Sequence, residues 1–278
     1  MKTLYKQAAE AIKKADALIV TTGAGMGVDS GLPDFRGNEG FWKAYPPIAK
    51  LGVSFSSMAN PKWFEEKPEL AWAFYGHRLN LYRKTIPHKG YEQLLEIGNS
   101  KPYGYFAFTS NVDGQFQKAG FDDERIEEVH GSIHHLQCTV PCSNDIWSAD
   151  ESQVIVDEDV FEAQEPLLKC PSCGAIARPN ILMFGDWHWL HERSAEQSNK
   201  FDFWLNELKN ANAKPVIIEF GAGKAVPTVR HKSQQIAKYF DATLIRINPR
   251  DYEIYERING ISISGGAMES MNEIFKLL

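Results

Sequence analysis

The sequence has no run of about 18 apolar residues, the length that a membrane-spanning helix requires. It also lacks an excess of basic residues, because its net charge is −6, whereas a general nucleic-acid or membrane-surface binder needs a basic face. The N-terminal segment is charged throughout and has no apolar stretch followed by a cleavage site, so no signal peptide is expected. These absences predict a cytoplasmic protein that binds neither nucleic acid nor membranes.

Cysteine is scarce as well, with four residues in the chain. In a cytoplasmic protein they are not expected to form structural disulfides. They lie in two pairs, Cys138-x3-Cys142 and Cys170-x2-Cys173, a spacing typical of a closed zinc site with four thiolate ligands. The segment between the pairs has no clear period and few apolar residues. We therefore predict a structural Zn²⁺ that stabilises this insertion, with unbound thiols or two disulfides as the alternatives.

Short apolar runs alternate with helical patterns along most of the chain, which predicts an α/β fold with a Rossmann-like parallel sheet covered on both faces. Strands are expected within 17–20, 103–109, 178–184, 214–221, 242–248 and 258–264. Helices are expected within 3–15, 68–84, 91–100, 200–212, 227–239 and 267–277, and a loop is expected at 33–45.

One apolar run leads directly into a glycine-rich turn, TTGAGMGVDSGLPDFRG at 21–37. In an open α/β sheet, ligands bind where strands end and such turns begin. The spacing is not the usual dinucleotide-binding motif, because Val28 stands where the third glycine is required, and no Gly-Lys-Ser/Thr follows as in a phosphate-binding P-loop. The turn is a candidate nucleotide site of another kind, although the glycines alone also fit a turn without a ligand.

Two more segments place polar side chains directly after predicted strands. TSNVDG puts Asn111 and Asp113 behind the strand that ends at Thr109, and EVHGS puts His130 behind a further short strand. Catalytic groups collect at this edge of open α/β sheets. Each segment is weak evidence alone, since a single histidine is more often structural than catalytic.

In this order and spacing, the motifs GAG, DSG-PDFRG, NVDG and HG resemble the sirtuins, the NAD-dependent protein lysine deacylases, and the resemblance covers almost the whole chain. It implies that an acyl group passes from a protein lysine to the ADP-ribose part of NAD and that nicotinamide is released. The implied organisation is a NAD-binding Rossmann-like domain at 1–34, 86–135 and 179–278, a cofactor loop and helical module at 35–85, and a zinc-binding module at 136–178.

The resemblance also implies which residues contact NAD. Gly23, Ala24 and Gly25 would turn backbone N–H groups toward the pyrophosphate, as helix N-termini do for anions. Further implied contacts are Asp34, Phe35 and Arg36 of the cofactor loop, Ser110, Gly221, Ala222, Gly223, and Asn248 at the adenosine ribose.

At the nicotinamide end, the resemblance implies that Asn111 has a catalytic role and that Asp113 binds the carboxamide. His130 would be the general base that acts through the ribose hydroxyls, because a histidine pKa near the working pH suits proton transfer. The products would be free lysine, nicotinamide and 2′-O-acyl-ADP-ribose. This step requires no metal.

Two segments resemble the substrate-binding parts of sirtuins. In MFGDW, the residues Phe184, Gly185 and Asp186 would let a peptide with an acylated lysine add as a strand. On the predicted helix 68–84, Tyr75 and Arg78 are three apart and share a face, and this Tyr-x-x-Arg resembles the sirtuin subgroup that removes acidic acyl groups such as succinyl. Alternatively, Tyr75 is a core residue and Arg78 lies on a solvated face.

The sequence departs from the sirtuin pattern at Ser110, where the family has glutamine, and at Ala222 and Gly223, where it has threonine and serine. Alanine and glycine offer no hydroxyl to the phosphates, which removes a hydrogen bond or two of about 1 kcal/mol each. The Gly223 N–H and Lys224 are candidates to compensate. An NAD-consuming ADP-ribosyltransferase or an NAD hydrolase is the alternative function.

Overall fold

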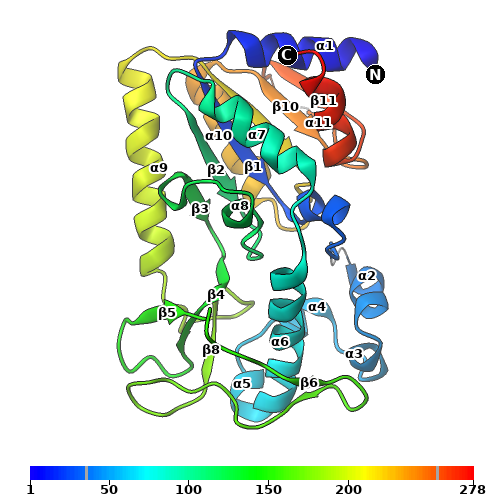
Figure 1. Ribbon diagram of the computed structural model, residues 1–278, viewed down its shortest axis with the longest axis vertical. Coiled ribbons are helices and arrows are strands. Elements are labelled where there is room, and N and C mark those ends of the chain that lie inside the picture. Colours follow the sequence, from blue (N-terminus) through cyan, green and yellow to red (C-terminus); the bar gives the residue numbers. More distant parts are fainter. Residues whose placement is uncertain (35–36, 255–256) are drawn as a thin grey trace.

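The computed structural model describes residues 1–34, 37–254 and 257–278. A six-stranded sheet forms its centre, in the order β11-β10-β9-β1-β2-β3, and all neighbouring strands are parallel (Figure 1). The strands are β1 (Ala17–Thr22), β2 (Tyr105–Thr109), β3 (Ile126–Glu128), β9 (Pro215–Phe220), β10 (Leu244–Ile247) and β11 (Gly260–Ile263). The predicted α/β fold with a Rossmann-like parallel sheet is confirmed.

The sheet is covered on both faces because its strands are apolar on both faces. Along β1, Leu18 and Val20 belong to one buried cluster, whereas Ala17 and Ile19 belong to another. The first cluster includes side chains of α1 (Lys2–Lys14), α7 (Lys89–Asn99) and α11 (Ala267–Phe275). The second includes those of α9 (Glu192–Asn210) and α10 (Thr228–Phe240). Continuous apolar runs of this kind are typical of buried parallel strands.

A second part of the molecule lies beyond the carboxyl ends of the parallel strands (Figure 1). It holds an antiparallel sheet in the order β5-β4-β8 and a small hairpin, β6-β7. The bounds are β4 (Gly131–Cys138), β5 (Ile146–Ser148), β6 (Val156–Asp157), β7 (Glu162–Ala163) and β8 (Ala177–Ile181). The apolar run at 178–184 therefore supplies a strand to this sheet and not to the parallel one.

Helices complete this second part: α2 (Gly37–Ala44), α3 (Pro46–Lys50), α4 (Phe55–Met58), α5 (Trp63–Glu66) and α6 (Pro68–Lys84). The prediction of a loop at 33–45 is wrong for the residues that α2 occupies. Tertiary packing explains the difference, because the Phe41 ring meets those of Phe55 and Phe74, on α4 and α6, at 5.5 and 5.8 Å. Short helices depend on such contacts more than on sequence propensity.

The remaining elements are the 3₁₀ helices η1 (Ala24–Ser30) and η2 (Asp123–Arg125) and the short helix α8 (Gln115–Lys118). Among the described residues, none of the helices combines the length and apolar character needed to cross a bilayer.

Candidate active site

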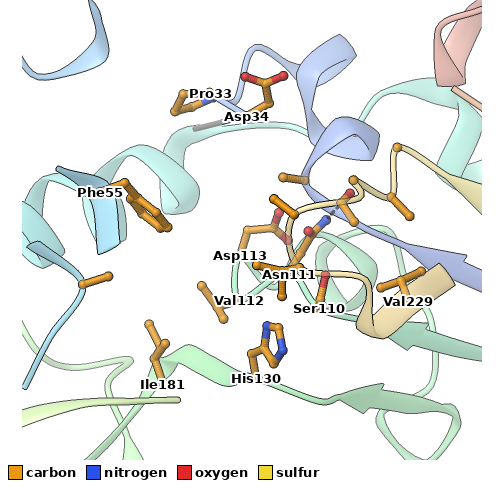
Figure 2. Close-up of a pocket in the computed structure, with 18 of the residues that line it drawn as sticks. Pro33, Asp34, Phe55, Ser110, Asn111, Val112, Asp113, His130, Ile181 and Val229 are labelled. Atoms are coloured by element: carbon orange, nitrogen blue, oxygen red, sulfur yellow. Dashed lines mark hydrogen bonds between the residues drawn. The ribbon is translucent and has the colours of Figure 1, made fainter. Parts of the chain in front are cut away.

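A cavity of about 780 Å³ lies where the parallel strands end and the second part begins (Figure 2). Most of the predicted site residues line it: Gly23, Ala24, Asp34, Tyr75, Arg78, Ser110, Asn111, Asp113, His130, Phe184, Gly221, Ala222 and Gly223. Four others lie outside its lining, namely Gly25, Gly185, Asp186 and Asn248. Phe35 and Arg36 lie outside the described residues.

The glycine turn after β1 packs against the loop after β9. The Gly23 N–H donates to the Phe220 carbonyl at 3.0 Å, and the Gly25 N–H donates to the Gly221 carbonyl at 3.2 Å. A Cβ at Gly221, whose φ is +58°, would lie 2.4 Å from the Gly25 Cα. The expectation that Gly23 and Gly25 offer amides to a phosphate therefore fails in this conformation, because loop packing uses them. Ala24 takes the first position of η1, where a helix-start N–H has no acceptor within the helix.

Asn111 and Asp113 follow β2 on a loop that enters the cavity. The Asn111 side-chain amide donates to the Gly23 carbonyl at 3.1 Å, which ties this loop to the glycine turn. The Asp113 Oδ1 accepts from the Gln115 N–H at 3.1 Å. Burial raises the pKa of Asp113 to about 6, opposed by that hydrogen bond. Asp113 is thus a buried carboxyl whose charge state changes just below neutral pH.

His130 stands between β3 and β4, and its ring points into the cavity below Ser110 and Asn111 (Figure 2). Burial lowers the pKa of His130, opposed by a hydrogen bond with the Ser110 backbone, so the imidazole is neutral at neutral pH. The next residue must be glycine, because Gly131 has φ +77° and a Cβ there would lie 2.1 Å from the Asn180 carbonyl oxygen. The close crossing of β4 and β8 therefore fixes where His130 can lie.

Tyr75 and Arg78 both lie on the cavity wall, and neither is on a solvated face. Tyr75 is 1% exposed and Arg78 is 7% exposed. The Arg78 Nε and Nη2 donate to the Tyr82 hydroxyl at 3.1 and 3.0 Å. Within the described part of the chain, the buried Tyr75 hydroxyl has no hydrogen-bond partner. Burial raises the pKa of Tyr75 to about 12, so this hydroxyl stays protonated.

In the predicted substrate segment, the Asp186 side chain points to Arg178. The Asp186 carboxylate accepts two hydrogen bonds from Arg178, at 2.7 and 2.9 Å, and is shielded from solvent. The Asp186 side chain is therefore buried in a structural ion pair, and a direct contact with the peptide stays a prediction. Phe184 stays at the cavity, and its backbone N–H donates to the Ala59 carbonyl at 2.9 Å while its carbonyl accepts from the Asn60 side chain at 3.0 Å.

Asn248 lies behind the cavity wall and is fully buried. Its Nδ2 donates to the Ala222 carbonyl at 3.0 Å, and its Oδ1 accepts from the N–H groups of Arg250 and Asp251, each at 3.0 Å. In this conformation its polar atoms hold two loops together. Nearby, the Lys224 ammonium forms an ion pair with Asp251 at 3.2 Å, and both residues line the cavity.

Several cavity residues were not expected from the sequence, among them Phe55, Tyr82, Val226 and Asp251. Tyr82 carried a usable signal, because it follows Arg78 by four residues on one helix and so shares its face. Phe55 begins the four-residue helix α4, and Val226 and Asp251 lie in loops, so no periodic pattern marks them. The packing of the two parts brings them together.

The four cysteines gather in one group away from the cavity. All their sulfurs lie within 4.8 Å of one another, and two pairs, Cys138 with Cys173 and Cys142 with Cys170, are 3.6 Å apart. A tetrahedron with Zn–S bonds of about 2.3 Å has edges of about 3.8 Å, whereas a disulfide needs about 2.05 Å. The thiols therefore fit a structural zinc ion, as predicted. Cys138 ends β4, so the whole strand separates the cluster from His130.

Comparison with known proteins places this geometry in a family. A model of the Sir2 family matches residues 23–206. The chain belongs to the Sir2 family. Two curated relatives, both named NAD-dependent protein deacylase, illustrate the similarity. The Leptospira interrogans protein is 28% identical over 250 residues, which cover 90% of this chain and 87% of that protein. The Thermococcus kodakarensis protein is 32% identical over 179 residues, or 64% of this chain.

The match spans less than two thirds of some relatives, namely 63% of the Thermococcus kodakarensis protein and 62% of the Aquifex aeolicus one. Solved Sir2 structures extend the likeness over nearly the whole chain. A Sir2 homolog–NAD complex has a TM-score of 0.72 at 26% identity and covers 97% of this chain and 92% of that one. A mutant Sir2 homologue with ADP-ribose has a TM-score of 0.72 at 27% identity and covers 98% and 95%.

Proposed function

We propose that this Sir2-family chain is an NAD-dependent protein lysine deacylase that transfers the acyl group to ADP-ribose. The observation that carries the proposal is the single cavity in which His130 faces the loop of Asn111 and Asp113 at the carboxyl ends of parallel strands. The names of the curated relatives and the NAD and ADP-ribose complexes of similar structures support it.

In this proposal, NAD lies along the loops that follow β1 and β9. The Ala24 amide and the Gly221-Ala222-Gly223 segment border its phosphates, and Asp34 lies on the side of its nicotinamide ribose. Gly23 and Gly25 contribute by letting the two loops approach. Asn248 supports the adenosine end of the site without lining the cavity, because its side chain joins Ala222 to Arg250 and Asp251 by hydrogen bonds.

The chemistry falls to the residues at the other end of the cavity. Asp113 and Asn111 hold the nicotinamide and its ribose in place for bond cleavage, with Ser110 beside them. His130, neutral because it is buried, takes the proton from the ribose hydroxyl as the acyl group is transferred.

We also propose that the enzyme prefers acyl groups that end in a carboxylate. The buried Arg78 guanidinium and the Tyr75 hydroxyl, which has no hydrogen-bond partner among the described residues, both line the cavity and can donate to such a carboxylate. Charge-assisted hydrogen bonds of about 1.5–3 kcal/mol correspond to roughly a 10- to 100-fold preference. The peptide that carries the acyl-lysine would pass along Phe184 and Gly185.

Both proposals can be tested with two peptides of the same sequence, one carrying succinyl-lysine and the other acetyl-lysine. Each peptide is incubated with the protein and NAD, and the products are measured by mass spectrometry. We expect acyl-ADP-ribose from both peptides and a higher kcat/KM on the succinyl peptide. Arg78→Met should remove that preference and leave deacetylation largely intact. Equal or better efficiency of the unmodified chain on acetyl-lysine overturns the acyl preference alone, whereas no acyl-ADP-ribose from either peptide overturns the deacylase function.

A further inference from the structure

A buried cation on α6 is surrounded by aromatic rings. The Arg78 guanidinium carbon lies 5.2 Å from the centre of the Phe74 ring, 5.5 Å from that of Tyr82 and 5.7 Å from that of Tyr75. Arginine packs well on such ring faces, but a buried guanidinium also needs acceptors for its N–H groups. The acceptors determine how the planar group is oriented within the cavity wall.

The Tyr82 hydroxyl accepts from two of these donors. Tyr82 follows Arg78 by one turn of α6, and its oxygen lies 3.1 Å from the Arg78 Nε and 3.0 Å from the Nη2. These two nitrogens form one edge of the guanidinium plane. Because the guanidinium is rigid and planar, fixing this edge also fixes the direction of the opposite Nη1 end.

Tyr82 orients Arg78 without cancelling its charge. Burial raises the pKa of the Tyr82 phenol, so the hydroxyl is neutral at physiological pH. A carboxylate in the same position would neutralise the guanidinium and compete with an anionic ligand. A neutral acceptor satisfies two N–H groups and leaves the positive charge on the wall of the cavity.

We propose that Tyr82 is a positioning residue for acyl recognition: its hydroxyl holds the Arg78 guanidinium in the orientation that receives the carboxylate of an acidic acyl-lysine. The inference rests on the proposed deacylase function and deepens it. Tyr75, Arg78 and Tyr82 all line one cavity. Acyl preference then depends on a three-residue arrangement along α6 and not on Tyr75 and Arg78 alone.

The test is Tyr82→Phe, which keeps the ring and removes only the oxygen. On the succinyl- and acetyl-lysine peptides, the succinyl-to-acetyl ratio of kcat/KM should fall about 3- to 10-fold, the effect expected if the misoriented Arg78 loses one hydrogen bond to the acyl carboxylate. The loss should be larger in KM for the succinyl peptide than in any kinetic constant for the acetyl peptide. In an Arg78→Met background, Tyr82→Phe should not change the ratio further.

Tyr91→Phe is the matched control, because it removes another buried hydroxyl, one without a hydrogen-bond partner in the described structure and outside the cavity lining. It should leave the ratio unchanged. An unchanged or raised ratio in Tyr82→Phe, equal losses on both peptides, or a further fall in the Arg78→Met background contradicts the positioning role.

Fluorescence anisotropy of labelled peptides measures the same preference without turnover and separates the two proposals. If the unmodified chain processes neither peptide, the deacylase function fails, and the binding ratio still tests Tyr82. If the unmodified chain binds both peptides equally, there is no acyl preference for Tyr82 to support, and the inference is overturned.

Discussion

Arg178 and Asp186 form a two-bond ion pair, 2.7 and 2.9 Å long, in which the two side chains are 1% and 0% exposed. The carboxylate also accepts from the N–H groups of Met183 and His188, at 3.3 and 3.2 Å. The turn that follows β8 is therefore fixed to the strand itself. Through this turn, the pair determines where Phe184 lies at the cavity.

Asp186→Ala should consequently lower the free energy of unfolding by about 3–5 kcal/mol, because it leaves the Arg178 charge buried and unpaired. Urea unfolding measures this change. Glu124→Ala is the control. The Glu124 side chain is 66% exposed, so its ion pair with Lys200 contributes at most about 1 kcal/mol to the free energy of unfolding. Equal small losses in both variants would contradict a structural role for Asp186.

The cysteine cluster predicts one Zn²⁺ per chain. Cys170→Ala should lose the metal and the folded zinc module, because the energy of metal binding is part of the folding energy. Elemental analysis of protein purified without chelator, together with circular dichroism, measures both effects. Metal-free protein that is folded and shows the same thermal transition would disprove the zinc site.

The buried carboxylate of Asp113 is expected to lower the stability of the fold, although we propose that NAD-dependent turnover requires the residue. Its pKa is raised by burial from 3.8 to about 6, so ionisation is less favourable in the folded chain than in the unfolded one. This carboxyl therefore destabilises the fold progressively as pH rises from about 4 to 6, and the cost is complete at pH 7. Two pKa units correspond to about 3 kcal/mol at most.

Asp113→Asn should therefore raise the melting temperature at pH 7 but not at pH 4, and it should impair NAD-dependent turnover. Asparagine keeps the oxygen that accepts from the Gln115 N–H, so the loop stays capped. Thermal melts at the two pH values provide the measurement. An equal shift at both values would show that the gain does not come from the carboxylate charge.

Much of the fold was predictable from local patterns. The helix expected at 68–84 is α6 with the same bounds, because a proline at its first turn and a continuous helical pattern define it. The apolar runs that became β1, β9 and β10 were recognisable because strands buried on both faces are apolar throughout. The prediction of a loop at 33–45 failed because α2 is stabilised by the ring contacts of Phe41 with Phe55 on α4 and Phe74 on α6.

The candidate site was predictable as a set of segments but not as a set of contacts. Motifs placed Asn111, Asp113 and His130 at strand ends, and the structure brings them to one cavity. No local pattern shows that Arg178 pairs with Asp186, or that the amide of Gly25 is used by Gly221. The first pairing joins a strand to the turn directly after it, and the second joins the segments that follow β1 and β9, so both depend on the folded path of the backbone and not on a residue pattern.

The most direct test of the account is the product formed from NAD and an acyl-lysine peptide by the unmodified chain and by His130→Ala. Mass spectrometry should find 2′-O-acyl-ADP-ribose, nicotinamide and free lysine in equal amounts with the unmodified chain. His130→Ala should form the acyl product about 10²–10⁴-fold more slowly while NAD binding is retained, because a general base is lost. Formation of acyl-ADP-ribose by His130→Ala at the parent rate would contradict the role of His130 as general base. Release of ADP-ribose and nicotinamide without peptide deacylation would contradict the deacylase function.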